Sequence, residues 1–189
     1  MRLGFLIYPR FTALDIVGPY EVLSRLGGEV VWPSFEAGPV QTDAGAALVA
    51  NASLDSCPAL DVLVVPGGPG QEDFMEDERL LGFLRERSAT ARWTASVCTG
   101  SLLLGAAGLL EGKRAVTHWL AMGRLPDYGA TPVAERIVED GNLITAAGVS
   151  AGIDMALWLV GQIYGVEHAR VTQYAMEYDP APPYAAITG

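Results

Sequence analysis

The segment at residues 95–104 limits the possible folds most strongly, because its periodicity changes within one short stretch. An apolar run typical of a buried strand ends at Cys98, and an apolar run typical of a helix begins after Gly100. A sharp turn from strand to helix can hold a nucleophile at the helix N-terminus, where unpaired N–H groups and the helix dipole favour a thiolate. The pattern differs from G-x-S-x-G, since Ser96 stands at the first glycine position and Cys98 at the serine position. The turn therefore predicts a reactive cysteine, and the alternative is a buried, inert one.

Composition narrows the class of protein that surrounds this turn. The 189 residues are 50% hydrophobic and 18% charged, which suits one α/β domain over residues 1–189 with helices on both faces of a sheet. A net charge of −10 and the lack of a basic run oppose nucleic-acid binding. Two cysteines make no disulfide framework, and the N-terminus resembles no leader peptide, so we expect a cytoplasmic protein. Residues 143–166 carry little charge but include Asp154 and several small residues, which favours a buried helix over a membrane span.

The N-terminal part of the chain predicts a strand followed by a helix. Residues 3–8 form an almost continuous apolar run, and apolar residues then recur at helical spacing up to position 26. Gly18 and Pro19 predict a helix that restarts there, with proline in its first turn. Asp15 then lies just before a helix start, where its simplest role is that of an N-cap.

A glycine-rich loop follows the strand predicted at residues 61–65. Its sequence, PGGPG, places Gly67 and Gly68 at the carboxyl end of a strand, the edge where open parallel sheets bind ligands. Glycine allows backbone N–H groups to come close to a substrate, although a plain turn has the same composition. The loop matches neither a Walker A sequence nor a dinucleotide fingerprint.

One histidine is a candidate partner for the cysteine. The run at residues 115–118 predicts a strand that ends at His118, and a strand end could bring this imidazole to the edge that carries Cys98. A packed, hydrogen-bonded histidine beside Trp119 is the alternative.

The other elements follow from local patterns. Asp140 and Gly141 predict a hairpin turn, and prolines from position 180 onward exclude a helical tail, which we expect to pack as an extended arm. We find no Cys/His spacing typical of a metal site, no repeat and no linker. The expected strands are 29–32 and 92–97. Residues 40–53 resemble a small hairpin or a strand with a loop, and residues 135–145 predict a hairpin. The expected helices are 80–88, 99–110 with interruptions at Gly105 and Gly108, 151–164 and 166–176.

Several of these motifs together resemble the DJ-1/PfpI superfamily. They are SVCTGS at the turn, VPGG in the glycine-rich loop, THW around His118 and DGNLITAAG before the helix at 151–164. Within the superfamily, the segment LDIVGP, the pair Cys98–Thr99 and the C-terminal EYDPAPPY are most similar to the isocyanide hydratases. The resemblance implies a flavodoxin-like three-layer α/β sandwich with a mostly parallel sheet, usually a homodimer, with a cysteine on a nucleophile elbow.

The resemblance also implies a chemistry that needs no cofactor and no metal. A Cys98 thiolate would attack the terminal carbon of an isocyanide, Asp15 would protonate that carbon, and water would release an N-substituted formamide from the thioimidate. Thr99 would orient Asp15, while backbone N–H groups of Gly68 and Thr99, with Gly67 beside them, would stabilise developing charge. His118 would contact the reacting groups without touching the substrate itself. Asp15 must hold a proton, so its surroundings should raise its pKa.

Two other functions stay open at this point. One is a non-catalytic small-molecule or redox sensor, since sensing domains that precede a helix-turn-helix share much of the elbow sequence. The other is a glyoxalase-like conversion of methylglyoxal to lactate. Asp15 in place of glutamate and Thr99 in place of histidine or alanine favour the hydratase branch. No helix-turn-helix follows within the sequence, which is shorter at its C-terminus than the hydratases, and this puts part of the dimer or pocket wall in doubt.

Overall fold

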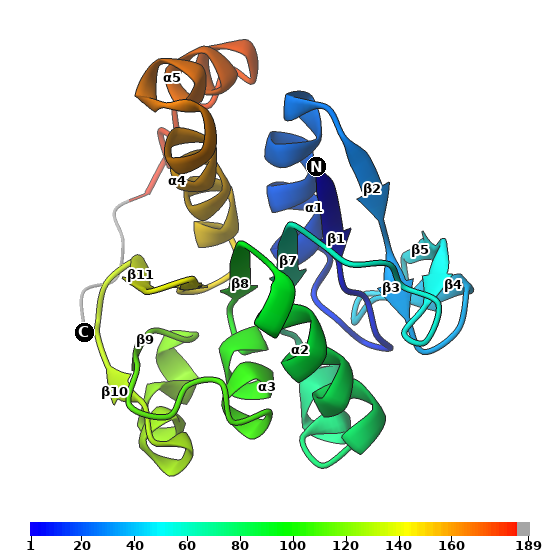
Figure 1. Cartoon of the computed structure of the whole chain (residues 1–189). Coiled ribbons are helices and arrows are strands. Elements are labelled where there is room, and N and C mark those ends of the chain that lie inside the picture. Colours follow the sequence, from blue (N-terminus) through cyan, green and yellow to red (C-terminus); the bar gives the residue numbers. More distant parts are fainter. Residues whose placement is uncertain (185–189) are drawn as a thin grey trace.

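A mostly parallel sheet forms the centre of the protein (Figure 1). The computed structural model describes residues 1–184. In this part of the chain the sheet has six strands in the order β11-β12-β8-β7-β1-β2, and only β11 runs antiparallel to its neighbour. The strands are β1 (Arg2–Phe5), β2 (Glu29–Val31), β7 (Val62–Val65), β8 (Trp93–Val97), β11 (Ile137–Asp140) and β12 (Leu143–Ala146).

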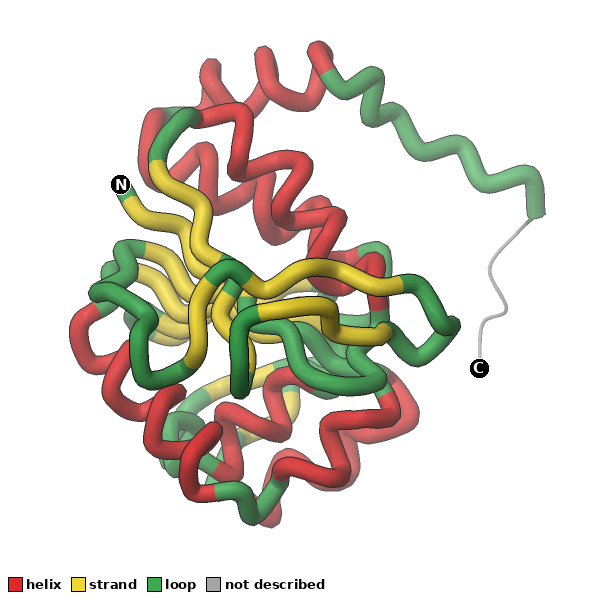
Figure 2. The backbone as a smooth tube through the Cα atoms, turned by 90° about the vertical axis from the view of Figure 1, so that its right-hand side faces the viewer, coloured by secondary structure: helices red, strands yellow, loops and turns green. Residues whose placement is uncertain are grey.

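Helices cover both faces of this sheet, as Figures 1 and 2 show. One layer holds α1 (Ala13–Leu23), α4 (Ala151–Tyr164) and α5 (Val166–Ala175), and the other holds α2 (Glu78–Thr90) and α3 (Gly100–Ala106). Every residue of β7 is buried because both faces of the sheet are covered. The three-layer α/β fold expected from the sequence is confirmed. In residues 1–184 no helix combines the length and the apolar character needed to cross a membrane.

Small residues let α1 pack closely on α4. A Cβ atom at Gly152 would lie 3.1 Å from Cγ of Pro19, and one at Gly18 would lie 3.0 Å from Cγ1 of Ile153. This close packing fixes the position of α1 against the sheet, and with it the position of Asp15.

Short elements decorate the edges of the sheet. The predicted hairpins are confirmed, as β4 and β5 pair antiparallel, and β11 and β12 do the same. The remaining short elements are η1 (Ser24–Leu26), β3 (Pro33–Ser34), β4 (Gly38–Gln41), β5 (Ala47–Ala50), β6 (Ala52–Ser53), η2 (Pro69–Phe74), β9 (Arg114–Ala115), η3 (Trp119–Tyr128) and β10 (Thr131–Pro132).

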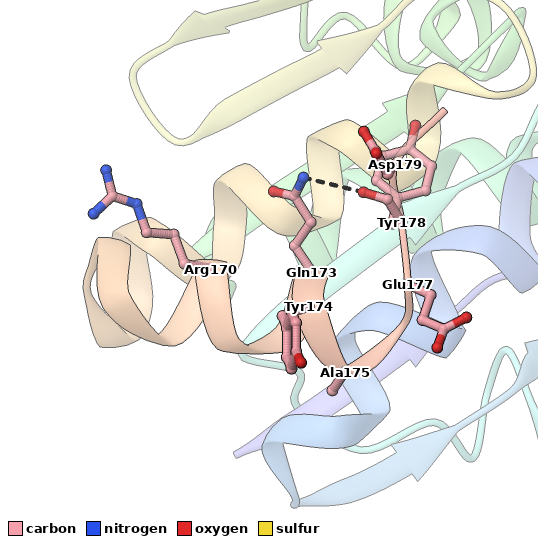
Figure 3. Close-up of a pocket in the computed structure, with 7 residues that line it drawn as sticks. All are labelled: Arg170, Gln173, Tyr174, Ala175, Glu177, Tyr178 and Asp179. Carbon is pink, nitrogen blue, oxygen red and sulfur yellow. Dashed lines mark hydrogen bonds between the residues drawn. The ribbon is translucent and has the colours of Figure 1, made fainter. Parts of the chain in front are cut away.

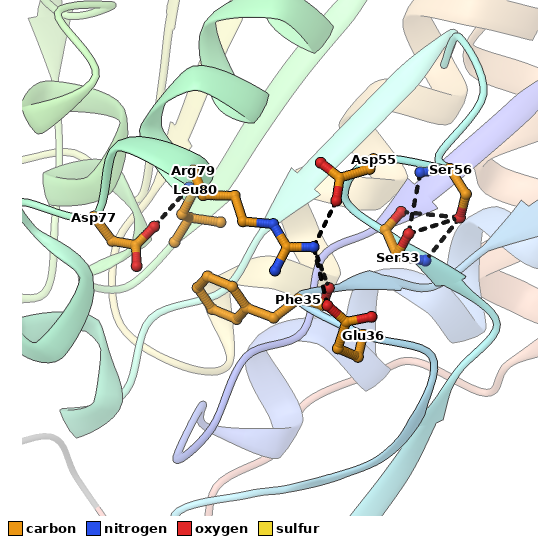
Figure 4. A network of polar contacts seen from close by, with 8 residues as sticks. All are labelled: Phe35, Glu36, Ser53, Asp55, Ser56, Asp77, Arg79 and Leu80. Carbon is orange, nitrogen blue, oxygen red and sulfur yellow. Dashed lines mark hydrogen bonds and ion pairs between the residues drawn. The ribbon is translucent and has the colours of Figure 1, made fainter.

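One arginine joins the start of α2 to two loops (Figure 4). The guanidinium of Arg79 donates hydrogen bonds to the carbonyl of Phe35 at 2.9 Å, to Glu36 at 3.1 Å and to Asp55 at 2.6 Å. Asp77 caps the same helix, since its Oδ1 accepts from the N–H of Leu80 at 2.9 Å. The Arg79 ion pairs are largely exposed and contribute little stability, so they mainly fix the direction of the loops.

Four local predictions are wrong. The first helix begins at Ala13 and continues through Pro19, because tight packing on α4 outweighs the lost backbone hydrogen bond. The helix expected to reach residue 110 ends at Ala106. The expected strand at 115–118 is only β9, which pairs with β10 outside the central sheet. The tail is not helical, as expected, but residues 179–184 are exposed rather than packed; residues 185–189 lie outside the described part.

Candidate active site

Cys98 lies on a strained turn at the carboxyl end of β8. Its φ angle is +57°, a conformation that costs a non-glycine residue energy and persists only when neighbours hold it. The neighbours are present: the N–H of Cys98 donates to the carbonyls of Ala146 at 3.1 Å and Ala147 at 2.8 Å, and the hydroxyl of Thr117 donates to the Cys98 carbonyl at 3.0 Å. The structure therefore contains the strand-to-helix turn predicted from the sequence, and hydrogen bonds to the end of β12 stabilise it.

The glycine-rich loop touches this elbow directly. A Cβ atom at Gly67 would lie 2.5 Å from the Thr99 nitrogen and 3.0 Å from Cβ of Cys98. A Cβ atom at Gly100 would lie 2.4 Å from the carbonyl oxygen of Val65. Only glycine allows the two segments to approach this closely, which explains why both loops need it.

Asp15 reaches the same corner from the first turn of α1. The side chain is fully buried, and Oδ2 accepts a hydrogen bond from the N–H of Gly67 at 2.9 Å. Its other oxygen, Oδ1, has no hydrogen-bond partner among residues 1–184. The N-cap position belongs to Thr12, so the capping role for Asp15 is wrong. The carboxyl group instead joins the elbow and the glycine-rich loop.

Burial controls the ionisation of both groups. It raises the pKa of Asp15 to about 7, with a smaller contribution from the charge of Asp43, against the hydrogen bond from Gly67 and a lesser opposing effect of the neighbouring Cys98 thiol. Burial also raises the pKa of Cys98 to about 12, and the charge of Asp15 adds to the effect. The direction of this shift agrees with the sequence prediction, and at neutral pH Asp15 is present in both its protonated and its ionised form.

The sequence predicts that the helix N-terminus favours a thiolate, but the net shift of the Cys98 pKa is upward. Backbone N–H groups of Thr99 and Val149 and the Thr99 hydroxyl do lower the pKa of Cys98, but desolvation and the neighbouring carboxylate are larger. The following helix, α3, has only seven residues. The thiolate is thus a minor form of the resting site, and the proton that the thiol loses needs an acceptor nearby.

Thr99 and Gly68 bond to each other. The N–H of Gly68 donates to Oγ1 of Thr99 at 3.1 Å, which leaves the hydroxyl hydrogen free to point to another acceptor. Within residues 1–184 no hydrogen bond joins Thr99 to Asp15, so the orienting role of Thr99 stays a prediction. The N–H of Gly68 is already engaged, whereas those of Thr99 and Val149 face the sulfur.

A cavity of about 440 Å³ opens above the cysteine. His118 lies on its wall as the N-cap of η3, where its Nδ1 accepts from the N–H of Leu120 at 3.3 Å. The described residues include no hydrogen bond from His118 to Cys98, so a Cys–His pair is not formed in this structure. The lining residues are Thr12, Gly68, Pro69, Gln71, Glu72, Cys98, Thr99, His118, Leu120, Ala121, Arg124 and Val149.

Sequence reasoning missed three residues of this site. Val149 and Thr117 contact Cys98 through groups whose positions depend on tertiary structure, although Thr117 belongs to the THW motif around His118. Gln71 lines the cavity and had no signal beyond its place after the glycine-rich loop. Residues 1–184 contain no group of three His, Cys, Asp or Glu side chains arranged to bind a metal.

A larger cavity, of about 760 Å³, lies on α5 and the segment after it (Figure 3). Its wall contains Arg170, Gln173, Tyr174 and Glu177, which are exposed to solvent. No cysteine or buried acid lines it. The chemistry of the two cavities therefore points to the smaller one as the active site.

Comparison with known proteins agrees with this geometry. The DJ-1/PfpI family model matches residues 1–162. An isonitrile hydratase from Pseudomonas putida is 48% identical over 187 residues, which cover 97% of this chain and 81% of that protein. The HTH-type transcriptional regulator GbdR from Pseudomonas aeruginosa is 29% identical over 174 residues, and the matched part covers only 47% of the regulator.

Solved structures show the same fold. A ThiJ/PfpI family protein from Pseudomonas syringae superimposes with a TM-score of 0.96 at 40% identity, covering 99% of this chain and 78% of that one. DJ-1beta from Drosophila melanogaster gives a TM-score of 0.86 at 22% identity, a level that shows the fold alone.

Proposed function

This chain belongs to the DJ-1/PfpI family, and on that premise we propose that it is an isocyanide hydratase, which converts R–N≡C and water to R–NH–CHO. Isonitrile and isocyanide name the same group, so the activity is that of the Pseudomonas putida relative. The proposal classes the chain as a hydro-lyase with a cysteine nucleophile and no cofactor.

The observation that carries the proposal is the pairing of a buried acid with a buried thiol. Asp15 has a pKa of about 7, so near neutral pH it can both accept and donate a proton. Cys98 has a raised pKa and loses its proton most readily to a base at the same site. Adding R–N≡C to a thiol requires one nucleophile and one proton delivered to the same carbon, and this pair supplies both.

The first half of the reaction forms a thioimidate. The thiol proton moves to the Asp15 carboxylate, and sulfur forms a bond to the isocyanide carbon. Asp15 then delivers the proton to that carbon, giving R–N=CH–S–Cys98. Backbone N–H groups of Thr99 and Val149 stabilise the thiolate before attack, because they face the sulfur.

The second half consumes water. The ionised Asp15 accepts a proton from water as the water oxygen attacks the thioimidate carbon, and Asp15 passes this proton to the nitrogen. The C–S bond breaks, the formamide leaves, and the second proton of water returns to the sulfur. The resting Cys98 thiol and the Asp15 carboxylate are regenerated, so no other reactant is consumed.

The cavity indicates a small substrate with an apolar R group. Its volume of about 440 Å³ lies in the range that holds small molecules, and Leu120, Ala121 and Val149 form apolar parts of its wall. Glu72 and Arg124 pair with each other at the wall, so their charges largely offset one another.

Turnover of a simple isocyanide tests the proposal. Purified protein mixed with benzyl isocyanide should give N-benzylformamide, detected by mass spectrometry, and ¹⁸O-water should place the label in the formyl oxygen. Conversion of methylglyoxal to lactate without formamide production would support a glyoxalase instead. If neither product forms but small molecules bind in the cavity, the sensor function that the match to GbdR suggests is the better one.

We also propose that the enzyme is a cytoplasmic homodimer. Both cysteines are free thiols, which suits a reducing compartment. Exposed Leu14 and Val17 on α1, with Val166 and Val171 on α5, offer apolar surface to a second copy. Light scattering should give twice the chain mass of 20.0 kDa, and a monomer at micromolar concentration would refute the dimer.

A further inference from the structure

Gln71 is a buried amide that the mechanism above does not use. Its side chain is 1% exposed, and it lines the cavity above Cys98. Its Nε2 atom has no hydrogen-bond partner among residues 1–184. Buried N–H groups are nearly always paired, because leaving one unpaired costs about 1–3 kcal/mol. A donor kept unpaired at the wall of an active site therefore points to a partner that arrives with the ligand.

Backbone contacts fix the position of the segment that carries Gln71. The N–H of Gln71 donates to the carbonyl of Gly68 at 3.0 Å, and the N–H of Gly70 donates to the carbonyl of Arg10 at 3.1 Å. A Cβ atom at Gly70 would lie 1.9 Å from the carbonyl oxygen of Pro9, so this segment is pressed against the loop after β1. Gly68 in turn bonds to Thr99, beside the nucleophile. Gln71 is thus positioned by the same contacts that build the elbow.

Isocyanide chemistry supplies an acceptor only after the reaction has begun. The nitrogen of R–N≡C has no lone pair, since all its valence electrons are in bonds. When sulfur attacks the carbon, one π-bond pair moves onto nitrogen, and this atom becomes a hydrogen-bond acceptor in the thioimidate. A donor aimed at that nitrogen stabilises the transition state and not the bound substrate, which is the condition for raising kcat.

We propose that the Gln71 side-chain amide is a catalytic residue that donates a hydrogen bond to the substrate nitrogen as the C–S bond forms. This inference rests on the proposed hydratase function. The hydrogen-bond acceptor is the isocyanide nitrogen, which has no lone pair in the substrate and gains one in the thioimidate. In the product the same donor meets the formyl oxygen, the acceptor nearest the former isocyanide carbon.

The test replaces the amide with an apolar side chain of similar length. Gln71→Met should lower kcat for benzyl isocyanide by about tenfold to a hundredfold, with KM changed less than about twofold. The midpoint of thermal unfolding should not fall, because Nε2 has no protein partner to lose. The rate of Cys98 alkylation by iodoacetamide should also be unchanged, which shows that the nucleophile is intact.

Trp93→Phe is the matched control. Nε1 of Trp93 is another buried N–H without a hydrogen-bond partner among residues 1–184, but it lies at the start of β8, away from the cavity. This variant should keep the wild-type kcat. A Gln71→Met enzyme with unchanged kcat, with only a raised KM, or with a loss of activity matched by a loss of thermal stability would overturn the proposal.

A second readout separates this inference from the proposed function. If the wild type does not hydrate benzyl isocyanide, the hydratase function fails, and N-benzylformamide binding is then measured by calorimetry. An affinity at least about tenfold weaker in Gln71→Met would support the amide as the polar anchor of the cavity. Equal affinities in the two proteins would refute the role of Gln71, whatever the activity.

Discussion

The two cysteines of this protein lie in contrasting surroundings. Both are buried, at 7% exposure for Cys98 and 4% for Cys57. Cys98 stands on a turn with positive φ at the wall of a cavity, beside a buried acid. Cys57 lies in the segment that leads to β7, where its thiol donates to the carbonyl of Pro58 at 3.5 Å and lines none of the described cavities.

Electrostatics alone would select the other cysteine. Burial raises the pKa of both thiols, but the guanidinium of Arg87 opposes this at Cys57, whereas the Asp15 charge adds to it at Cys98. Cys57 therefore has the partner that favours a thiolate. The comparison shows that a nucleophile at this kind of site is defined by an adjacent proton acceptor and an open cavity, and not by a low resting pKa.

Removing each thiol in turn should give the largest difference in activity between the two cysteines. Cys98→Ala should reduce formamide production to the background rate, because Cys98 is the one thiol among the residues that line this cavity. Cys57→Ala should keep the wild-type kcat and lose only about 1 kcal/mol of stability from the smaller buried side chain. Turnover of benzyl isocyanide and chemical denaturation of both variants check this. Activity that persists in Cys98→Ala would overturn the mechanism.

Replacing Asp15 with a neutral residue tests the feature that separates the two cysteines, since the charged partner of Cys57 is Arg87. Asp15→Asn should lower kcat by about 10²- to 10⁴-fold, because an amide neither accepts the thiol proton nor donates one to carbon. The amide oxygen can still accept from the N–H of Gly67, so the fold should survive. Steady-state kinetics with circular dichroism test this, and an active Asp15→Asn enzyme would exclude Asp15 as the acid.

The same variant should change the pH dependence of stability. The folded pKa of Asp15, about 7, exceeds the ordinary value of 3.8 for this group, so wild-type stability falls as pH rises from about 4 to 7. Above pH 7 the buried Asp15 carboxylate is fully ionised, and its desolvation lowers the free energy of unfolding by a constant amount. Asp15→Asn should therefore be more stable than the wild type at pH 8 by about 2–4 kcal/mol, with the difference vanishing near pH 4. Urea unfolding at several pH values measures it, and a difference independent of pH would contradict the raised pKa.

Thiol labelling gives the smallest expected effect. Iodoacetamide should modify Cys98 several-fold faster than Cys57 in the folded protein, because the cavity admits the reagent to Cys98. Peptide mass mapping after a short reaction gives the ratio. Equal labelling, or preferential labelling of Cys57, would mean that the local charge at Arg87 matters more than access through the cavity.

Local patterns were enough to predict most of the fold. The strands β7 and β8, the hairpin of β11 and β12, and the helix Ala151–Tyr164 follow from apolar periodicity and turn residues, which act over a few positions. The strand expected to end at His118 failed because only Arg114 and Ala115 form a strand, which pairs with β10 outside the central sheet. The sequence predicts a helix that restarts at Pro19, but close packing against Gly152, far along the chain, keeps Pro19 inside α1.

By itself, the sequence determined that a cysteine stands on a strand-to-helix turn, that glycines follow the neighbouring strand, and that the fold is α/β. The tertiary structure brings Asp15 into one buried corner with Gly67 and Cys98 and keeps the resting thiol protonated. It also leaves Nε2 of Gln71, a residue on the cavity wall, without a hydrogen-bond partner among residues 1–184. Turns and periodicity depend on residues a few positions apart. Desolvation and hydrogen-bond satisfaction depend on everything packed around a group, and in this site those neighbours come from five separate segments of the chain.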